Sequence, residues 1–105
     1  MLTDETRYRI LKSLEADPSA SQRAIARELG ISLGKVNYCL QALIDKGLVK
    51  ATNFRNSPNK ARYLYTLTPQ GIEEKSRVTA RFLKRKLAEY DEIQREIEEL
   101  RKDLS

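Results

Sequence analysis

Residues 21–50 read SQRAIARELGISLGKVNYCLQALIDKGLVK, and this stretch decides the fold. Its apolar residues return every three or four positions, first around Ile25 and then from Val36 onward, which predicts two amphipathic helices. Gly30 separates them at the point where a helix end usually needs a left-handed residue. A serine suited to capping a helix N-terminus precedes each segment. The stretch therefore predicts a helix, a tight turn and a second helix that ends before Gly47.

The second of these helices is expected to have one buried and one outward side. Val36, Leu40 and Leu43 recur at helical spacing and predict the buried side. The other side carries the residues that we expect to contact DNA: Ser32, Gly34, Lys35, Asn37, Tyr38 and Gln41. Amide side chains pair bidentately with adenine, lysine reaches guanine or phosphate, and glycine permits close backbone approach, whereas the tyrosine is equally suited to cover the domain surface. This layout predicts a helix-turn-helix whose second helix enters the major groove.

The flanking sequence adds a helix before this motif and a hairpin after it. Apolar spacing predicts a first helix that Thr3 or Asp4 can cap and that runs to about Glu15. Two strands are predicted at 48–54 and 61–67, around a polar turn at 56–60. Three helices followed by a two-stranded hairpin is the order of a winged helix-turn-helix. Near the hairpin tip lie side chains suited to phosphates or the minor groove: Arg55, Asn56, Lys60 and Arg62.

Thr68-Pro69 opens the last predicted helix with a cap followed by proline at the first helical position. No later proline interrupts this helix, so it is expected to run close to the C-terminus, with Ile72 docked on the domain. Apolar residues then recur at the three-and-four spacing of a coiled coil, although Lys86 occupies one seam position. The residues expected to pair two copies are Leu83, Tyr90, Ile93, Ile97, Leu100 and Leu104. The alternative is a helix that packs back on its own domain.

Charge is divided unevenly along the chain. The formal net charge is +5 and the pI is about 9.5, which suits a polyanionic partner. Residues 1–88 carry more basic than acidic side chains, whereas most of the charged side chains in residues 89–105 are acidic. An acidic tail is repelled by DNA, so the end of the last helix is expected to have another role.

The inventory of reactive side chains excludes several classes of function. The chain has no histidine and one cysteine, Cys39, so a histidine-dependent triad, a Cys/His zinc site and an internal disulfide framework are ruled out. Cys39 is predicted to be a small packing residue rather than a redox sensor. No paired carboxylate or glycine-rich phosphate loop is present, so we expect no enzyme activity, no metal and no cofactor. No signal peptide or membrane span is recognised either, and a cytoplasmic protein without membrane contact is expected by default.

The quoted stretch, followed by YLYTLTPQGIEEK at 63–75, resembles the MarR-type winged-helix transcriptional regulators. The LTPQG opening of the last helix is typical of them, and SLGKVNYCLQALIDKG at 32–47 is most similar to the short MarR-like group associated with bacterial exopolysaccharide (EPS) gene clusters. The resemblance implies a homodimer that binds promoter DNA sequence-specifically, with the wing beside the groove. Larger members enclose an effector pocket with extra helices, whereas this chain has one helix after the wing, so a small-molecule effector is not expected.

Together these features predict a mainly α protein with a small β-hairpin wing. Residues 1–68 are expected to form the winged helix-turn-helix DNA-binding domain, and residues 69–105 a coiled-coil-like helix for dimerisation. The partners expected are double-stranded DNA and a second copy of the chain. The rival hypothesis is a winged-helix module whose third helix binds a protein.

Overall fold

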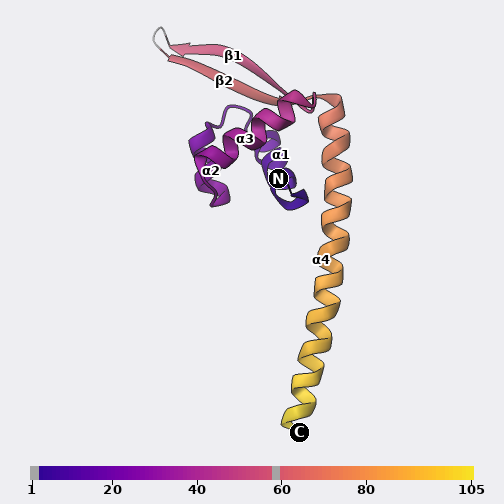
Figure 1. The fold of residues 1–105 in the computed structure, drawn as a ribbon. Helices are drawn as coiled ribbons and strands as arrows, with labels where there is room; N and C mark the ends of the chain where they lie inside the picture. The colour runs from indigo at the N-terminus through magenta and orange to yellow at the C-terminus, as the bar shows by residue number, and fades with distance from the viewer. Residues whose placement is uncertain (1–2, 58–59) are drawn as a thin grey trace.

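In the computed structural model the described residues form four helices and one antiparallel hairpin (Figure 1). The structure describes residues 3–57 and 60–105, and for residues 54–57 and 60–62 it describes the backbone only. The elements are α1 (Asp4–Ala16), α2 (Gln22–Leu29), α3 (Leu33–Asp45), β1 (Val49–Ser57), β2 (Lys60–Leu67) and α4 (Pro69–Leu104). The predicted order and the predicted fold class are confirmed. Both strands reach further toward the hairpin tip than the polar turn at 56–60 had indicated.

A hydroxyl side chain caps the N-terminus of every helix. Each capping oxygen accepts a hydrogen bond from the backbone N–H three residues later and so satisfies one of the free donors of the first turn. The caps are Thr3, Ser21, Ser32 and Thr68. At the other end of α2, Gly30 adopts the left-handed conformation with φ of 68°, as its position in the sequence predicted. These local signals fix the boundaries of the helix-turn-helix motif.

The core lies where α1, α2 and α3 meet the base of the wing. Each of the three helices contributes a side chain with at most 1% of its surface exposed: Leu11, Ile25 and Leu40, respectively. Such apolar burial is the main favourable term that holds short helices together. Cys39 belongs to the same cluster, and burial raises the pKa of its thiol. The prediction that Cys39 is a packing residue is therefore confirmed, because only 1% of its surface is exposed and it lies within the core cluster.

The wing is attached to the helices at its base. Its two strands are paired antiparallel from Val49 opposite Leu67 outward, with a register irregularity between Arg55 and Ser57. The backbone N–H of Tyr65 donates to the carbonyl oxygen of Pro18 at 3.0 Å, which joins β2 to the α1–α2 loop. The hairpin therefore projects from a fixed root beside the helix-turn-helix motif (Figure 1).

The root of α4 is held against the turn that follows α3. The Thr68 hydroxyl donates to the carbonyl oxygen of Gly47 at 2.6 Å, and the Thr68 N–H donates to that of Leu48 at 3.0 Å. Gly71, in the first turn of α4, faces the Leu48 carbonyl so closely that a Cβ atom there would overlap the oxygen. Glycine is therefore required at this position for close packing rather than for a positive φ.

Only the first part of α4 packs on the domain. Val78 is fully buried, and the Phe82 ring meets the Tyr8 ring of α1 edge-on with 5.5 Å between centroids. Beyond Arg85, which still lies 3.9 Å from Asp4 of α1, the helix leaves the domain, and the molecule is 70 Å long (Figure 1). Ile72 is 54% exposed, so the prediction that it docks on the domain is wrong. Gly71 and Val78 make that contact instead, because they lie on the helix side that faces α1 and the Gly47–Leu48 turn.

None of the helices described, within residues 3–57 and 60–105, is both long enough and apolar enough to cross a bilayer.

Replacing Gly71 with alanine should destabilise the fold. The added methyl group must displace the Leu48 carbonyl or tilt α4, and overpacking of this kind costs about 1–3 kcal/mol. Gly34→Ala is the matched control, because nothing lies within 4 Å of a Cβ atom at that helical position. The free energy of unfolding in urea should fall for Gly71→Ala and stay level or rise for Gly34→Ala. Equal free energies of unfolding for the two variants would show that the close contact with Leu48 does not limit the size of the side chain at position 71.

Candidate nucleic-acid interface

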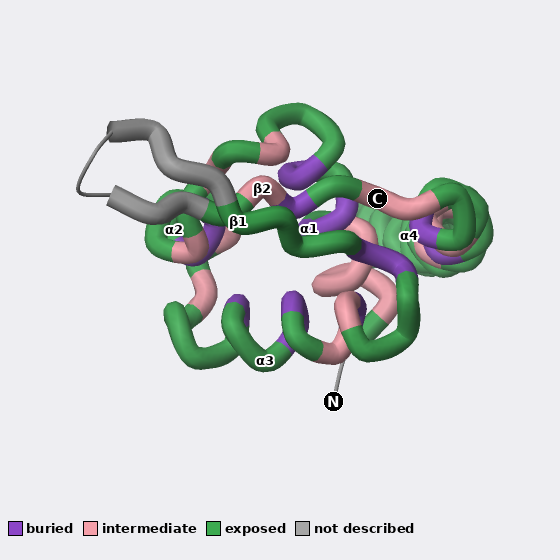
Figure 2. The backbone as a smooth tube through the Cα atoms, turned by 90° about the horizontal axis from the view of Figure 1, so that it is seen from above, coloured by how far each residue is buried: buried purple, intermediate pink, exposed green. Residues whose placement is uncertain are grey.

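Helix α3 presents a polar side to solvent from a scaffold held by its apolar side. Val36, Leu40 and Leu43 are buried at 1% exposure or less. Figure 2 shows α3 at the rim of the domain, with its buried residues toward the centre and its exposed turns outward. All the α3 residues expected to contact DNA are exposed: Ser32, Gly34, Lys35, Asn37, Tyr38 and Gln41. The described part of the chain therefore leaves this face free, as a DNA-reading helix requires.

Two exposed amides on this face have defined orientations. The Nδ2 of Asn37 donates to the Oε1 of Gln22 at 3.2 Å, and the Nε2 of Gln41 donates to the Oδ1 of Asp45 at 3.0 Å. Both amides line an open groove of about 270 Å³ between α3 and the base of the wing, where Tyr63 also lies. Tyr63 is 51% exposed and stacks on Tyr65, with 6.1 Å between ring centroids. The face thus combines hydrogen-bonding amides with an aromatic side chain.

Four of the predicted contact residues belong to the wing. The side chains of Arg55, Asn56, Lys60 and Arg62 lie outside the described residues. The backbone register places Arg55 opposite Ala61, close to the hairpin tip. Their role toward phosphates or the minor groove stays a prediction.

The outer part of α4 carries a continuous exposed apolar stripe. Its residues follow one another at intervals of three or four positions, which is the spacing of a coiled-coil seam. The stripe consists of Leu83, Leu87, Tyr90, Ile93, Ile97, Leu100 and Leu104, each at least 43% exposed. Leu87 was missed in the sequence, because Lys86 was placed in the seam at that turn. The ammonium group of Lys86 instead lies 5.4 Å from the Phe82 ring centroid and pairs with Glu89.

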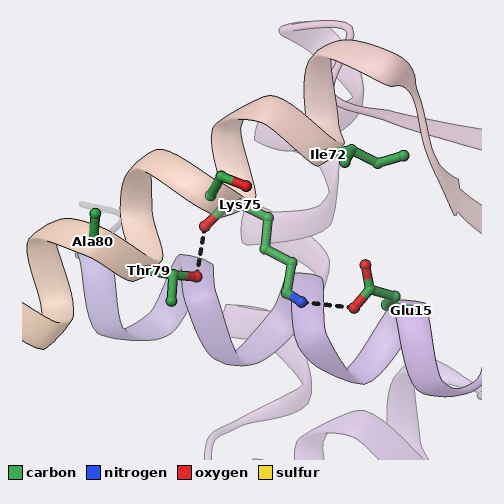
Figure 3. A pocket seen from close by; sticks show the side chains of 6 residues that line it. Glu15, Ile72, Lys75, Thr79 and Ala80 are labelled. Carbon is green, nitrogen blue, oxygen red and sulfur yellow. Dashed lines mark hydrogen bonds and ion pairs between the residues drawn. The ribbon is translucent and has the colours of Figure 1, made fainter.

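Basic residues in the middle of α4 are engaged with α1. Arg81 donates to both carboxylate oxygens of Asp4, at 3.1 and 3.3 Å, and Arg85 lies 3.9 Å from the same group. The hydrogen bond from Arg81 is the main reason that the pKa of Asp4 is lowered, and the nearby arginine charges add to it. Figure 3 shows a second contact, in which Lys75 of α4 reaches Glu15 of α1 at 2.6 Å. These pairs fix α4 along α1.

No cluster of three or more histidine, cysteine, aspartate or glutamate side chains with the geometry of a metal site occurs among the described residues. A groove of about 380 Å³ along the contact between α1 and α4, lined by Glu15, Lys75 and Thr79 among others, is open to solvent. The Thr79 hydroxyl donates back to the Lys75 carbonyl of its own helix at 2.6 Å (Figure 3).

Comparisons with known proteins agree with this geometry. Residues 3–50 match the family described as winged helix-turn-helix DNA-binding. The PcaV transcriptional regulator from Streptomyces coelicolor, solved with its natural ligand, is 23% identical with a TM-score of 0.67, over 79% of this chain and 57% of its own. A variant of ZitR from Lactococcus lactis is 25% identical with a TM-score of 0.62, over 83% of this chain and 57% of its own. No curated protein sequence matches the chain significantly.

A third solved relative is a variant of MepR from S. aureus, 23% identical with a TM-score of 0.60, over 78% of this chain and 59% of its own. The chain thus spans a little over half the length of these three proteins. The fold is that of a winged helix-turn-helix protein, and the family that residues 3–50 match is described as DNA-binding. PcaV, ZitR and MepR are MarR-family regulators rather than enzymes, and the MarR-like resemblance of the sequence is confirmed.

Lowering the pH should loosen α4 from α1 through Asp4. Because the pKa of Asp4 in the folded chain lies below its ordinary value of 3.8, the ion pair stabilises the fold above about pH 4 and is lost as the pH falls through the lowered pKa. Asp4→Asn should therefore lower the unfolding midpoint at neutral pH, and its difference from the wild type should shrink as the pH falls below about 4.

Glu5→Gln is the control for this measurement. Glu5 also lies in the first turn of α1, but it pairs with Arg9 of the same helix at 3.1 Å. Both variants remove one favourable charge from the helix N-terminus, and only Asp4→Asn removes a tie to α4. Equal losses in the two variants at neutral pH would show that the Asp4–Arg81 pair does not hold α4.

Proposed function

We propose that the protein is a sequence-specific transcriptional regulator that binds promoter DNA as a homodimer. The observation that carries the proposal is the exposed amide-bearing side of α3, held by a buried core within a domain that matches a DNA-binding family. A helix of this kind reads base edges in the major groove, where each base pair presents its own donors and acceptors. The chain's net charge of +5 supplies the attraction to phosphates that brings the domain to DNA.

The residues of α3 and the wing divide into two proposed roles. Lys35, Asn37, Tyr38 and Gln41 read bases, while Ser32 and Gly34, at the start of the helix, permit close approach to the backbone. The wing residues hold phosphates or enter the minor groove: Arg55, Asn56, Lys60 and Arg62. Base contacts set the preferred sequence, and phosphate contacts set the register and the salt dependence.

Dimerisation is proposed to occur through residues 83–104 of α4. The large side chains of the apolar stripe there are each at least 43% exposed in the single chain, and burying each of them contributes about 1.5–3 kcal/mol. A few such residues offset the ~4–15 kcal/mol that association costs. The division into a DNA-binding domain, 1–68, and a dimerising helix, 69–105, follows from this role. A homodimer in turn predicts a near-palindromic operator with half-sites about 10–21 base pairs apart.

The resemblance to the short MarR-like group extends the proposal to the regulated genes. The regulator is proposed to act in the cytoplasm on the promoters of exopolysaccharide genes. The sequence SLGKVNYCLQALIDKG at 32–47 supports this assignment.

Replacing Asn37 with alanine should relax base preference at one operator position. A bidentate amide–base pair contributes about 1–3 kcal/mol of discrimination, and its loss should leave the other positions unchanged. The measurement selects duplexes with a randomised core on the wild-type protein, then compares the affinities of wild type and variant for the selected sequence and its single-base changes. Gln41→Ala is the matched variant, because it removes an amide one turn further along α3 and should relax a different position.

Two results would contradict this assignment of the DNA-reading face. An equal loss of affinity for selected and random duplexes would make Asn37 a backbone contact. A wild-type protein that enriches no sequence and shows no salt-sensitive retention on heparin would favour the rival, a winged helix that binds a protein through α3.

Replacing Ile97 with aspartate should separate the two copies. An unpaired charge in the buried seam should raise the dimer dissociation constant roughly 100-fold or more. Ala88→Asp is the control, because it places the same charge on the side of α4 away from the stripe. Sedimentation equilibrium measures both variants, and neither should unfold the domain, since both positions are exposed in the single chain. A monomeric wild type, or a dimer unaffected by Ile97→Asp, would remove the stripe from the interface.

A further inference from the structure

One hydrogen-bonded chain connects the outward face of α3 to the interior of the domain. Asn37 donates through Nδ2 to the Oε1 of Gln22 at 3.2 Å. Gln22 in turn donates through Nε2 to the hydroxyl oxygen of Tyr65 at 3.1 Å. These two hydrogen bonds therefore link three elements: α3, the first residue of α2, and strand β2 of the wing.

The burial of these residues decreases outward from the domain interior. Tyr65 is 7% exposed and packs in the core, Gln22 is half-buried, and Asn37 is exposed. The buried end of this hydrogen-bonded series is therefore Tyr65, whose backbone N–H also donates to the carbonyl oxygen of Pro18 at 3.0 Å. Gln22 is held at its amino group by a core residue and offers its oxygen to Asn37.

This arrangement determines which way the Asn37 amide faces. An amide has a carbonyl oxygen that only accepts and an amino group that only donates, so the Gln22 oxygen binds the amino side of Asn37. One N–H of Asn37 is used in this way, and its second N–H and its carbonyl oxygen stay available. Adenine presents one acceptor and one donor in the major groove, which this pair of groups matches. A rotated amide would present its donor and acceptor in exchanged places and lose the match.

We propose that Gln22 is a positioning residue for base recognition: it fixes the Asn37 carboxamide in the orientation that reads adenine, with Tyr65 as its anchor. This inference rests on the proposed function, because it assumes that α3 reads DNA. Gln22 acts through Asn37 and touches no base itself. An amide pair at the surface adds little to stability, since water replaces its hydrogen bonds on unfolding, so its effect is expected in recognition rather than in folding.

The test uses the full chain and the same selection from duplexes with a randomised core. Gln22→Met removes both hydrogen bonds at nearly unchanged side-chain length. It should reduce discrimination about 3- to 10-fold at the one position that Asn37→Ala identifies, with the slope of affinity against salt unchanged. Tyr65→Phe removes only the anchor and should weaken discrimination at the same position to a smaller extent. Thermal unfolding of each variant, followed by circular dichroism, monitors the fold.

A double variant distinguishes positioning from direct contact. If Gln22 acts through Asn37, adding Gln22→Met to Asn37→Ala should change discrimination no further, because the group being positioned is gone. Additive losses would show that Gln22 contacts DNA independently and would overturn the inference. Gln22→Glu keeps an acceptor for Asn37 and can accept from the Tyr65 hydroxyl. It should retain the base preference while its negative charge lowers the affinity for every duplex.

The outcomes distinguish failure of the proposed function from failure of the positioning role of Gln22. If the wild type enriches no sequence, the proposed function falls and this inference falls with it. If the wild type enriches a sequence and Asn37→Ala relaxes one position but Gln22→Met does not, the proposed function stands and the positioning role is wrong. A uniform loss of affinity in Gln22→Met, with base preference intact, would assign Gln22 to phosphate contact and likewise overturn the inference.

Discussion

The contact between the first turn of α4 and the turn after α3 determines how the rest of the molecule is arranged. Thr68 bonds to Gly47 and Leu48, and Gly71 lets the helix backbone approach the Leu48 carbonyl without a side chain between them. Because the wing starts at Val49 and ends at Leu67, this contact also closes the base of the hairpin. One small region therefore sets the direction in which α4 leaves and the position from which the wing projects.

That region and the core place the two proposed binding surfaces at a distance from each other. The outward side of α3 lies at one end of the molecule, and the apolar stripe of α4 runs away from the domain toward the other (Figure 1). Ion pairs such as Asp4–Arg81 hold the inner part of α4 along α1, so the helix begins as part of the domain. In the proposed dimer, the angle of α4 would set the spacing of the two DNA-reading helices, which is how the fold links dimerisation to operator geometry.

Much of the fold was predictable because its signals are local. Caps at Ser21 and Ser32, the left-handed glycine at position 30 and the apolar spacing of α3 each act within one or two helical turns, and the structure agrees with them. Ile72 shows the limit of such reasoning, since an apolar residue in the first turn of α4 was expected to dock and is 54% exposed. Which side of a helix meets the domain depends on how its root is rotated, and that rotation is set by contacts distant in sequence.

The sequence by itself determined the order of the elements, the face of α3 that carries amides and the charge difference between domain and tail, because periodicity and composition express these directly. Tertiary structure alone decided that Gly71 and Val78, rather than Ile72, meet the domain. It also brought Gln22 to Asn37 and Tyr65, since 15 and 43 residues separate these partners along the chain. Hydrogen bonds between side chains need distances and angles that no spacing pattern encodes, so they appear only when packed helices fix the groups in space.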